Sequence, residues 1–324
     1  MENTEKKQPL VQVKNLCKYF EISRKETLKA VDDLTFDIYK GETVSLVGES
    51  GCGKSTTGRT MIKLYNPTSG NVYYDGKDIF KYNHAEQKEF CKKVQMIFQN
   101  PYSSLNPRMT VKDIVGEGLK QHGMSTKDAD AKVEQLLATV GLNKDHMSRF
   151  PHEFSGGQRQ RIGIARALSV DPEFIICDEP ISALDVSIQA QVINMLKELQ
   201  EERGLTYLFI AHDLSVVKYI SDRVVVMYLG TMVETAETDE LYAHPMHPYT
   251  QALLGAQFSI HMDPSQKIQS IESEAPSPLD VPKGCPFQNR CENCTDRCKA
   301  EMPKLKEIAP GHAVACFYVE EQKI

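Results

Sequence analysis

The sequence lacks any apolar run of the roughly 18 residues that a membrane-spanning helix needs. Its longest apolar stretches, such as VVVMYLG at 224–230, have the length of buried strands. The first 25 residues are polar and charged, without the apolar core of a signal peptide. These absences predict a cytosolic protein that does not cross a membrane by itself.

An excess of positive charge is also missing. The chain has 38 Lys and Arg against 44 Asp and Glu, which gives a formal net charge of −6. Such a chain has no overall field that attracts nucleic acid, so we expect no nucleic-acid partner. With 41% hydrophobic residues, the 324-residue chain has the composition of an ordinary globular protein and the length of about two domains.

A glycine-rich loop follows a short apolar run. The run TVSLV at 43–47 predicts a buried strand, and GESGCGKST at 48–56 fits the pattern G-x-x-x-x-G-K-[ST] between a strand and a helix. In such a loop the backbone amides surround phosphates, Lys54 reaches the β and γ phosphates, and Ser55 binds Mg²⁺. The predicted nucleotide-binding residues of the loop are Gly48, Glu49, Ser50, Gly51, Cys52, Gly53, Lys54, Ser55 and Thr56.

One residue of this loop carries an expectation of its own. Cys52 lies beside Lys54 and the expected helix start, an environment that lowers the pKa of a thiol. We therefore expect alkylation of Cys52 to block ATP binding, and bound nucleotide to protect the thiol.

Two further apolar runs end in polar residues. EFIICDEP at 173–180 places Asp178 to hold the magnesium shell and Glu179 to act as general base on the attacking water, or to orient it. By themselves these acids could equally cap a strand, but beside the loop described above the catalytic interpretation is favoured. LTYLFIAHDL at 205–214 brings His212 to a strand end, where side chains of an open α/β sheet face the ligand crevice. A lone histidine is more often structural than catalytic, yet here His212 is a candidate sensor of the γ-phosphate.

The stretch PHEFSGGQ at 151–158 sets two glycines behind Ser155, directly before the amphipathic run RQRIGIARAL. Glycine lets backbone N–H groups approach an anion closely, and a helix start adds the positive end of its dipole. The stretch therefore predicts a phosphate contact.

Taken in order, these motifs resemble those of the ATP-binding cassette ATPases over about residues 10–250. FSGGQ at 154–158 is similar to the family's signature motif, with Phe154 in place of the commoner leucine. MIFQN and SALD resemble the Q-loop and the D-loop, which implies roles for Gln99 and Asp185. Phe20 falls where an aromatic ring stacks on adenine, with Tyr19 as the alternative.

The resemblance implies that two cassettes bind head to tail, with the signature of one meeting the γ-phosphate held by the other. One chain then carries two complementary half-sites and cannot hydrolyse ATP in the family's manner alone. The implied catalytic residues are Glu179, His212 and Gln99, and the implied magnesium ligands are Ser55, Gln99 and Asp178. The implied lid consists of Ser155, Gly156, Gly157 and Gln158.

The implied fold is α/β: a P-loop NTPase core of the RecA-like type with an antiparallel β subdomain, an inserted α-helical subdomain and a small Cys-rich C-terminal segment. Helical spacing predicts two amphipathic helices in the insertion, on the residues Val111, Ile114, Val115 and Leu119, then Val133, Leu136, Leu137 and Val140. The predicted divisions are 1–98 for the first part of the core, 99–170 for the helical subdomain with the signature, 171–255 for the second part of the core, and 256–324 for the Cys-rich extension.

Several stretches are more specific and resemble the oligopeptide/dipeptide importer ATPases of bacteria. They are NPYSSLNPRMTV at 100–111, ALDVSIQAQV at 183–192, HPYTQALL at 247–254, APSPL at 275–279, GCPFQNRC at 284–291 and GHAVAC at 311–316. TTGRTMIKLYNPTSG at 56–70 is more similar to the F-type than to the D-type subunit of that family.

This resemblance implies a peripheral protein at the cytoplasmic face of the cell membrane. Its implied partners are a paralogous ATPase subunit or a second copy of itself, two integral membrane permeases and, indirectly, an extracytoplasmic peptide-binding protein. The rival interpretation is a soluble cassette ATPase acting on nucleic acid or ribosomes. Such proteins usually carry long coiled-coil or DNA-binding insertions or two cassettes, and this chain has neither.

Cysteine is concentrated near the C-terminus, with five of the nine residues between 285 and 316. In a cytosolic chain this density favours a metal site over disulfides. The family resemblance implies a [4Fe-4S] cluster on the four residues Cys285, Cys291, Cys298 and Cys316, although four thiolates serve structural zinc equally well. Cys294, which forms C-x-x-C with Cys291, and His312 are alternative ligands. We expect a structural role for the metal.

Overall fold

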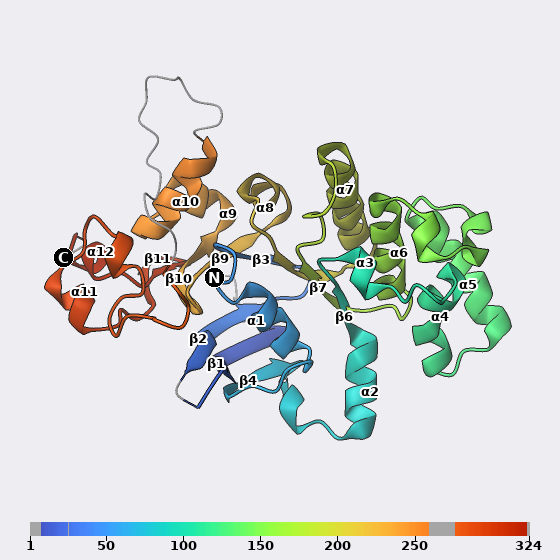
Figure 1. Ribbon diagram of the computed structural model, residues 1–324, viewed down its shortest axis with the longest axis horizontal. Coiled ribbons are helices and arrows are strands. Elements are labelled where there is room, and N and C mark those ends of the chain that lie inside the picture. The colour runs from blue at the N-terminus through green and yellow to red at the C-terminus, as the bar shows by residue number, and fades with distance from the viewer. Residues whose placement is uncertain (1–7, 25, 259–275, 323–324) are drawn as a thin grey trace, which may run out of the picture. The chain divides into compact units, whose positions relative to one another are not determined.

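The computed structural model describes residues 8–24, 26–258 and 276–322 (Figure 1). Part of the predicted Cys-rich extension, including Ala275 of APSPL, therefore lies outside the described residues. The chain divides into two compact units. Unit 1 consists of Met1–Ile38, Thr43–Phe80 and Ala211–Ile324, and unit 2 of Tyr39–Glu42 and Lys81–Ile210.

Unit 1 contains an antiparallel sheet with the strand order β2-β1-β4-β5. Its strands are β1 (Val11–Glu21), β2 (Thr27–Ile38), β4 (Ser69–Tyr74) and β5 (Lys77–Asp78). Val11 pairs with Ile38 on one side and with Tyr74 on the other, so β1 is the central strand of this pairing. The antiparallel β subdomain implied by the sequence is thus present.

A second group of strands in unit 1 runs in the order β11-β12-β10-β9-β3. These strands are β3 (Thr43–Val47), β9 (Arg223–Tyr228), β10 (Thr231–Glu237), β11 (Lys306–Ala309) and β12 (His312–Val314). β3 pairs with β9 in parallel, and all five residues of β3 are buried. Continuous apolar runs such as TVSLV suit strands that are covered on both faces. The helices of unit 1 are α1 (Lys54–Met61), α8 (Leu214–Ile220), α9 (Thr238–Ala243), α10 (Pro248–Phe258), α11 (Asp296–Ala300) and α12 (Phe317–Gln322), with the short 3-10 turn η5 (Gln288–Arg290).

Unit 2 contains three parallel strands in the order β8-β7-β6, surrounded by helices. The strands are β6 (Val94–Ile97), β7 (Phe174–Asp178) and β8 (Thr206–Ile210). The helices are α2 (His84–Lys93), α3 (Pro101–Ser104), α4 (Val111–Gln121), α5 (Thr126–Thr139), α6 (Gly156–Leu168) and α7 (Val186–Arg203). The 3-10 turns are η1 (Ile79–Lys81), η2 (Lys144–Ser148) and η3 (Pro151–Glu153), of which η1 lies at the unit boundary.

The two amphipathic helices predicted from the sequence are confirmed as α4 and α5. Each begins after a side-chain cap, because Thr110 accepts a hydrogen bond from the N–H of Asp113 and Ser125 accepts one from the N–H of Asp128. Their apolar side chains are buried as the spacing required, and Val140 caps the end of α5. The mixed α/β architecture is confirmed as well.

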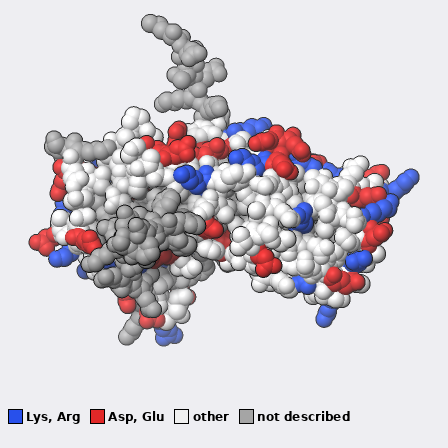
Figure 2. Space-filling model, turned by 90° about the horizontal axis from the view of Figure 1, so that it is seen from above, with Lys and Arg blue, Asp and Glu red and all other residues white. Residues whose placement is uncertain are grey.

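No helix among the described residues combines the length and the apolarity needed to span a bilayer. On the face drawn in Figure 2, acidic and basic side chains are interspersed among uncharged ones. The charge visible on that face therefore has no single sign.

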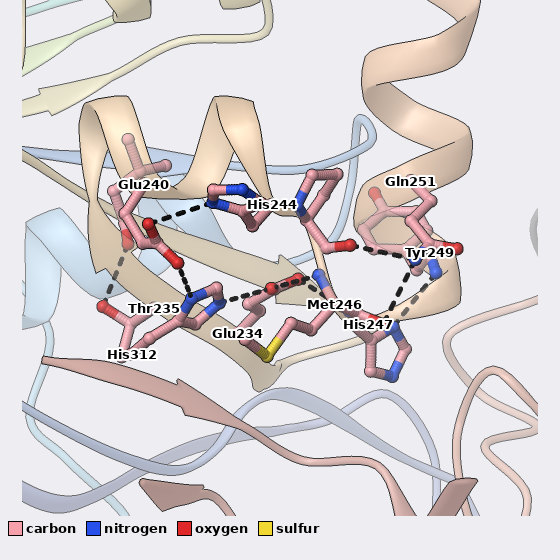
Figure 3. Close-up of polar contacts among 11 residues, drawn as sticks. Glu234, Thr235, Glu240, His244, Met246, His247, Tyr249, Gln251 and His312 are labelled. Carbon is pink, nitrogen blue, oxygen red and sulfur yellow. Dashed lines mark hydrogen bonds and ion pairs between the residues drawn. The ribbon is translucent and has the colours of Figure 1, made fainter. Parts of the chain in front are cut away.

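His312 anchors the C-terminal strand β12 to the rest of unit 1 (Figure 3). Its Nε2 lies 2.7 Å from Oε1 of Glu234 on β10, and both side chains are fully buried. Its Nδ1 lies 3.4 Å from Oε1 of Glu240 on α9. Burial by itself lowers the pKa of His312, but the two carboxylates outweigh it, so the pKa lies above its ordinary value.

The same carboxylate of Glu234 also accepts the backbone N–H groups of Met246 and His247, at 2.7 and 3.0 Å. Glu240 is shared with the exposed His244, whose Nδ1 lies 3.1 Å away. One buried acid thus joins β10, β12 and the segment before α10.

This ion pair predicts a pH dependence of stability. A histidine whose pKa is raised in the folded state contributes its full stabilisation below its unfolded pKa and loses it as the pH rises through the folded pKa. The contribution of His312 should therefore decline as the pH rises above about 6.5. We expect His312→Gln to lower the free energy of unfolding by about 3 kcal/mol at pH 6 and by less at pH 9.

Denaturant unfolding across this pH range measures the effect. His244→Gln is the matched control, because that histidine is exposed and pairs with Glu240 alone among the groups described here. A difference between His312→Gln and the native chain that does not change with pH would contradict a charged pair at this position.

Candidate functional site

The predicted phosphate loop connects β3 to α1 in unit 1. At Gly48 the backbone has φ 149°, and a Cβ there would lie 2.2 Å from the carbonyl oxygen of Met227, so only glycine fits. The ammonium of Lys54 is buried and donates to the carbonyl oxygens of Gly48 and Glu49, at 2.7 and 2.9 Å. Lys54 thus folds back over its own loop. This ammonium and the start of α1 bring positive charge to the loop, as an anion site requires.

The environment of Cys52 differs from the expectation. Its side chain is only 3% exposed, and burial raises the pKa of the thiol although Lys54 acts in the opposite direction. The prediction of a lowered pKa was therefore wrong. The sequence shows the neighbouring charge of Lys54 but not the burial of the thiol, and burial has the larger effect on the pKa of Cys52.

Phe20 and His212 also belong to unit 1. Phe20 lies half-buried on β1, with its ring edge-on to Tyr65 at 5.6 Å. The alternative Tyr19 uses its hydroxyl to bond Asp32, so it is tied into the sheet. His212 is exposed and directly precedes Asp213, which caps α8.

In unit 2, the acid pair follows the buried strand β7. Asp178 is fully buried, and Glu179 adopts a left-handed backbone with φ 45°. Such a conformation costs on the order of 1–3 kcal/mol for a residue other than glycine, and it recurs at functional sites. The N–H of Glu179 donates to the carbonyl oxygen of Ile210 on β8 at 2.9 Å, which holds the strained residue in place.

Gln99 is brought directly to this acid. Its Nε2 donates to Oε2 of Glu179 at 2.7 Å, although 80 residues separate them in the chain. The structure therefore joins two of the predicted catalytic residues. The amide orients the carboxylate that the sequence assigned to the attacking water.

The signature stretch forms the start of α6, which Ser155 caps. Its Oγ accepts the N–H of Gln158 at 3.4 Å, and Oε1 of Gln158 accepts the N–H of Ser155 at 3.0 Å, which makes a capping box. The two glycines have different surroundings. A Cβ on Gly157 would lie 2.6 Å from Ile188, whereas a Cβ on Gly156 would meet nothing closer than 3.8 Å. Internal packing thus requires glycine at 157 and leaves space at 156.

Asp185 is exposed at the N-cap position of helix α7, without a side-chain hydrogen bond to the helix. The signature and the D-loop are close to each other, because the atoms nearest to a Cβ on Gly156 include Leu184 and Ala183. Unit 2 therefore holds Gln99, Asp178, Glu179, Asp185 and the signature residues, while unit 1 holds the phosphate loop, Phe20 and His212.

The clustered cysteines line one small cavity of about 10 Å³. The lining includes Cys285, Cys291, Cys294, Cys298 and Cys316. Burial raises the pKa of Cys285 to about 12 and that of Cys291 to about 11, and the neighbouring cysteines add to both shifts. Within the described ranges, no three His, Cys, Asp or Glu side chains are grouped so that they could hold a metal ion. The prediction of a metal site is therefore not supported by this arrangement. His312 faces Glu234 and Glu240 and is not a candidate ligand.

Two residues that contact the phosphate loop were missed by sequence reasoning. The hydroxyl of Tyr249 accepts the N–H of Glu49 at 2.9 Å, and both Nη atoms of Arg290 donate to the carboxylate of Glu49. They lie 200 and 241 residues away in the chain, and neither belongs to a motif for nucleotides.

Comparisons with known proteins agree with these motifs. The family model described as ABC transporter matches residues 31–182, and the model described as Oligopeptide/dipeptide transporter, C-terminal region, matches residues 233–298. Among solved structures, the dimeric post-hydrolysis state of the ATP-binding cassette MJ0796 bound to ADP and Pi has a TM-score of 0.65 and 30% identity, covering 70% of this chain and 98% of that one. The cassette cbiO1 from Clostridium perfringens has a TM-score of 0.64 and 26% identity, covering 73% and 91%. The fold and the motifs thus define an ATPase of the ATP-binding cassette class, as predicted.

The curated relatives narrow this class. The putative oligopeptide transport ATP-binding protein YkfD of Bacillus subtilis is 54% identical over 95% of each chain. The oligopeptide transport ATP-binding protein OppF of the same organism is 55% identical over 96% of this chain and 97% of its own. The chain belongs to the family of oligopeptide transport ATP-binding proteins, and the preference for the F-type is confirmed.

The burial of Cys52 gives a prediction about its reactivity. A buried thiol with a raised pKa reacts more slowly than an exposed one, so iodoacetamide at pH 7.5 should label Cys52 at least about tenfold more slowly than Cys91. Cys91 is exposed and serves as the control within the same chain. Peptide mass spectrometry over time measures both rates. Equal rates would show that the loop opens readily or that the thiol is activated.

Proposed function

We propose that this chain is the ATP-hydrolysing subunit of a bacterial importer of oligopeptides or dipeptides. The observation that carries the proposal is the Gln99–Glu179 hydrogen bond in a cassette whose full-length relatives are named oligopeptide transport ATP-binding proteins. An acid oriented in this way suits hydrolysis better than mere nucleotide sensing.

In the proposed reaction each predicted site residue has a separate role. The phosphate loop binds the triphosphate through its amides, Lys54 neutralises the β and γ phosphates, and Phe20 stacks on adenine. Glu179 orients the attacking water and accepts its proton as the γ-phosphorus bond to ADP breaks, while His212 contacts the γ-phosphate. Ser55, Gln99 and Asp178 would hold magnesium, which would supply positive charge to the phosphates.

A second cassette completes the site in this proposal. Gly156 supports it, because no neighbour within unit 2 demands the absence of a side chain there, whereas an approaching phosphate does. Ser155, Gly156, Gly157 and Gln158 then contact a nucleotide held by the other cassette, with Asp185 nearby. The second cassette is a paralogous subunit or another copy of this chain, and the solved MJ0796 cassette is described as a dimer.

Coupling to transport requires partners in the membrane. We place the chain at the cytoplasmic face, beneath two integral permeases that receive peptides from an extracytoplasmic binding protein. Closure of the two cassettes around ATP then drives the permeases, and hydrolysis resets them. The chain itself does not touch the peptide.

We also propose that Cys285, Cys291, Cys298 and Cys316 hold a [4Fe-4S] cluster. In such a cluster each thiolate binds a different iron, so the sulfurs need not converge on one point as they do about 2.3 Å from zinc. The closeness of the cysteines supports the proposal, because five of them line one cavity. The cavity now has room for about one water, so the cysteines must move outward to admit the cluster. The cluster would supply a structural cross-link for a segment with little core of its own.

Replacing the proposed base tests the ATPase assignment. Glu179→Gln keeps the size of the side chain and removes its basicity, so turnover should fall about 10²- to 10⁴-fold while ATP still binds and the closed cassette pair accumulates. Steady-state hydrolysis and size-exclusion chromatography with ATP measure both effects. Glu173→Gln is the control, since that acid lies at the other end of β7 and pairs with Lys93. Turnover of Glu179→Gln at the native rate would remove Glu179 from the mechanism.

Iron analysis tests the cysteine proposal. Protein purified without oxygen should be brown, contain about four irons per chain and bleach on reduction. Cys298→Ser should lose colour and iron, whereas Cys91→Ser should keep both, because Cys91 lies outside the cysteine cavity. A colourless protein with one zinc per chain would refute the cluster.

A further inference from the structure

Glu49 is an acid inside a loop that binds a highly negative ligand. It occupies one of the variable positions of the motif, directly after Gly48, and its side chain is 27% exposed. An uncompensated carboxylate at this place repels the phosphates. Compensation of the Glu49 charge therefore favours the binding of ATP by this loop.

Arg290 supplies this compensation from the C-terminal extension. Its Nη1 lies 2.9 Å from Oε2 of Glu49 and its Nη2 lies 3.0 Å from Oε1, which is the bidentate geometry of a strong arginine–carboxylate pair. The side chain of Arg290 is only 5% exposed. Nη1 also donates to the hydroxyl of Tyr228 at 3.2 Å. The fork is thus fixed in direction and shielded from solvent.

The backbone of Glu49 is held by the same part of the chain. The hydroxyl of Tyr249 accepts the N–H of Glu49 at 2.9 Å. Tyr249 and Tyr228 pack against each other with ring centroids 4.7 Å apart, and both contact Phe287 of the extension, at 5.5 and 5.3 Å. Phe287 is 3% exposed, so this aromatic cluster is a firm base for Arg290.

The position of Arg290 is set by the cysteine-lined segment. It ends the short turn η5, which lies between Cys285 and Cys291. The N–H of Arg290 donates to the carbonyl oxygen of Phe287 at 3.0 Å, and the N–H of Cys285 donates to the carbonyl oxygen of Cys298 at 2.7 Å. The residue that pairs with the phosphate loop is therefore held within the cysteine-lined segment.

We propose that Arg290 is a positioning residue of the ATP-binding loop, by which the cysteine-lined segment supports the binding of ATP. It neutralises Glu49 and fixes the loop without touching the nucleotide. The role rests on the proposed binding of ATP by the phosphate loop, and it adds a control from a part of the chain outside the cassette motifs.

The test compares ATP affinities of full-length variants by equilibrium titration with ATP and Mg²⁺. Arg290→Ala leaves Glu49 unpaired beside the phosphates, so the dissociation constant for ATP should rise about tenfold. Arg290→Lys keeps the charge but not the fork and should recover part of the affinity. Glu49→Gln in the Arg290→Ala background removes the repelling acid and should restore affinity to within about threefold of native.

Arg297→Ala is the matched control. Arg297 belongs to the same extension, stacks on Phe317 at 3.9 Å and pairs with Glu301 and Glu321, so its loss perturbs the extension without affecting Glu49. Its ATP affinity should equal the native value. Thermal unfolding without nucleotide shows that each variant is folded.

The outcomes separate this inference from the proposed function. Native affinity in Arg290→Ala, an equal loss in Arg297→Ala, or no recovery on adding Glu49→Gln would overturn the role of Arg290. Lys54→Ala tests the loop itself, because it removes the ammonium that reaches the phosphates. Native ATP affinity in Lys54→Ala would overturn the proposed nucleotide site, whereas loss in Lys54→Ala with native affinity in Arg290→Ala would overturn only the inference.

Discussion

The candidate site depends on two helix starts, each of which can accept a phosphate. The first N–H groups of any helix have no partner within the helix, and an anion satisfies them well. The chain offers such a start at α1, behind a loop whose glycine at 48 is required by the carbonyl oxygen of Met227, and another at α6, behind the exposed Ser155. Because a Cβ at Gly156 would meet nothing closer than 3.8 Å, the second start suits a phosphate that another molecule brings. A chain with these two features therefore carries one part of a nucleotide-binding site at the start of α1 and a different part at the start of α6.

Charge compensation follows from the first of these helix starts. A loop that concentrates positive charge for a triphosphate still carries Glu49, and the fork of Arg290 neutralises that acid. The C-terminal extension therefore contributes to the charge around the nucleotide site. The buried Glu234–His312 pair attaches β12 of the same extension to β10. Both charged pairs join segments that are distant in the sequence.

Local patterns in the sequence predicted the elements that depend on local physics. The apolar run TVSLV forms β3, and the spacing of Val111 to Leu119 predicted α4. The glycine loop forms the turn into α1. The motifs located Glu179 and Gln99, although only the structure showed their hydrogen bond. Burial was harder to foresee. The raised pKa of Cys52 and the grip of Arg290 on Glu49 both depend on packing between residues far apart in the chain, for which one sequence holds no signal.

A single substitution tests the central claim, that the signature glycine of this chain serves a nucleotide held by another cassette. Gly156→Asp has room within unit 2, and an acid in the first turn of α6 favours the helix, so the fold should persist while the new charge repels an incoming phosphate. The account predicts native ATP affinity of the isolated chain together with a loss of turnover of about 100-fold or more in the assembled transporter. Native turnover in the assembled transporter, or a matching loss of ATP affinity in the isolated chain, would contradict it.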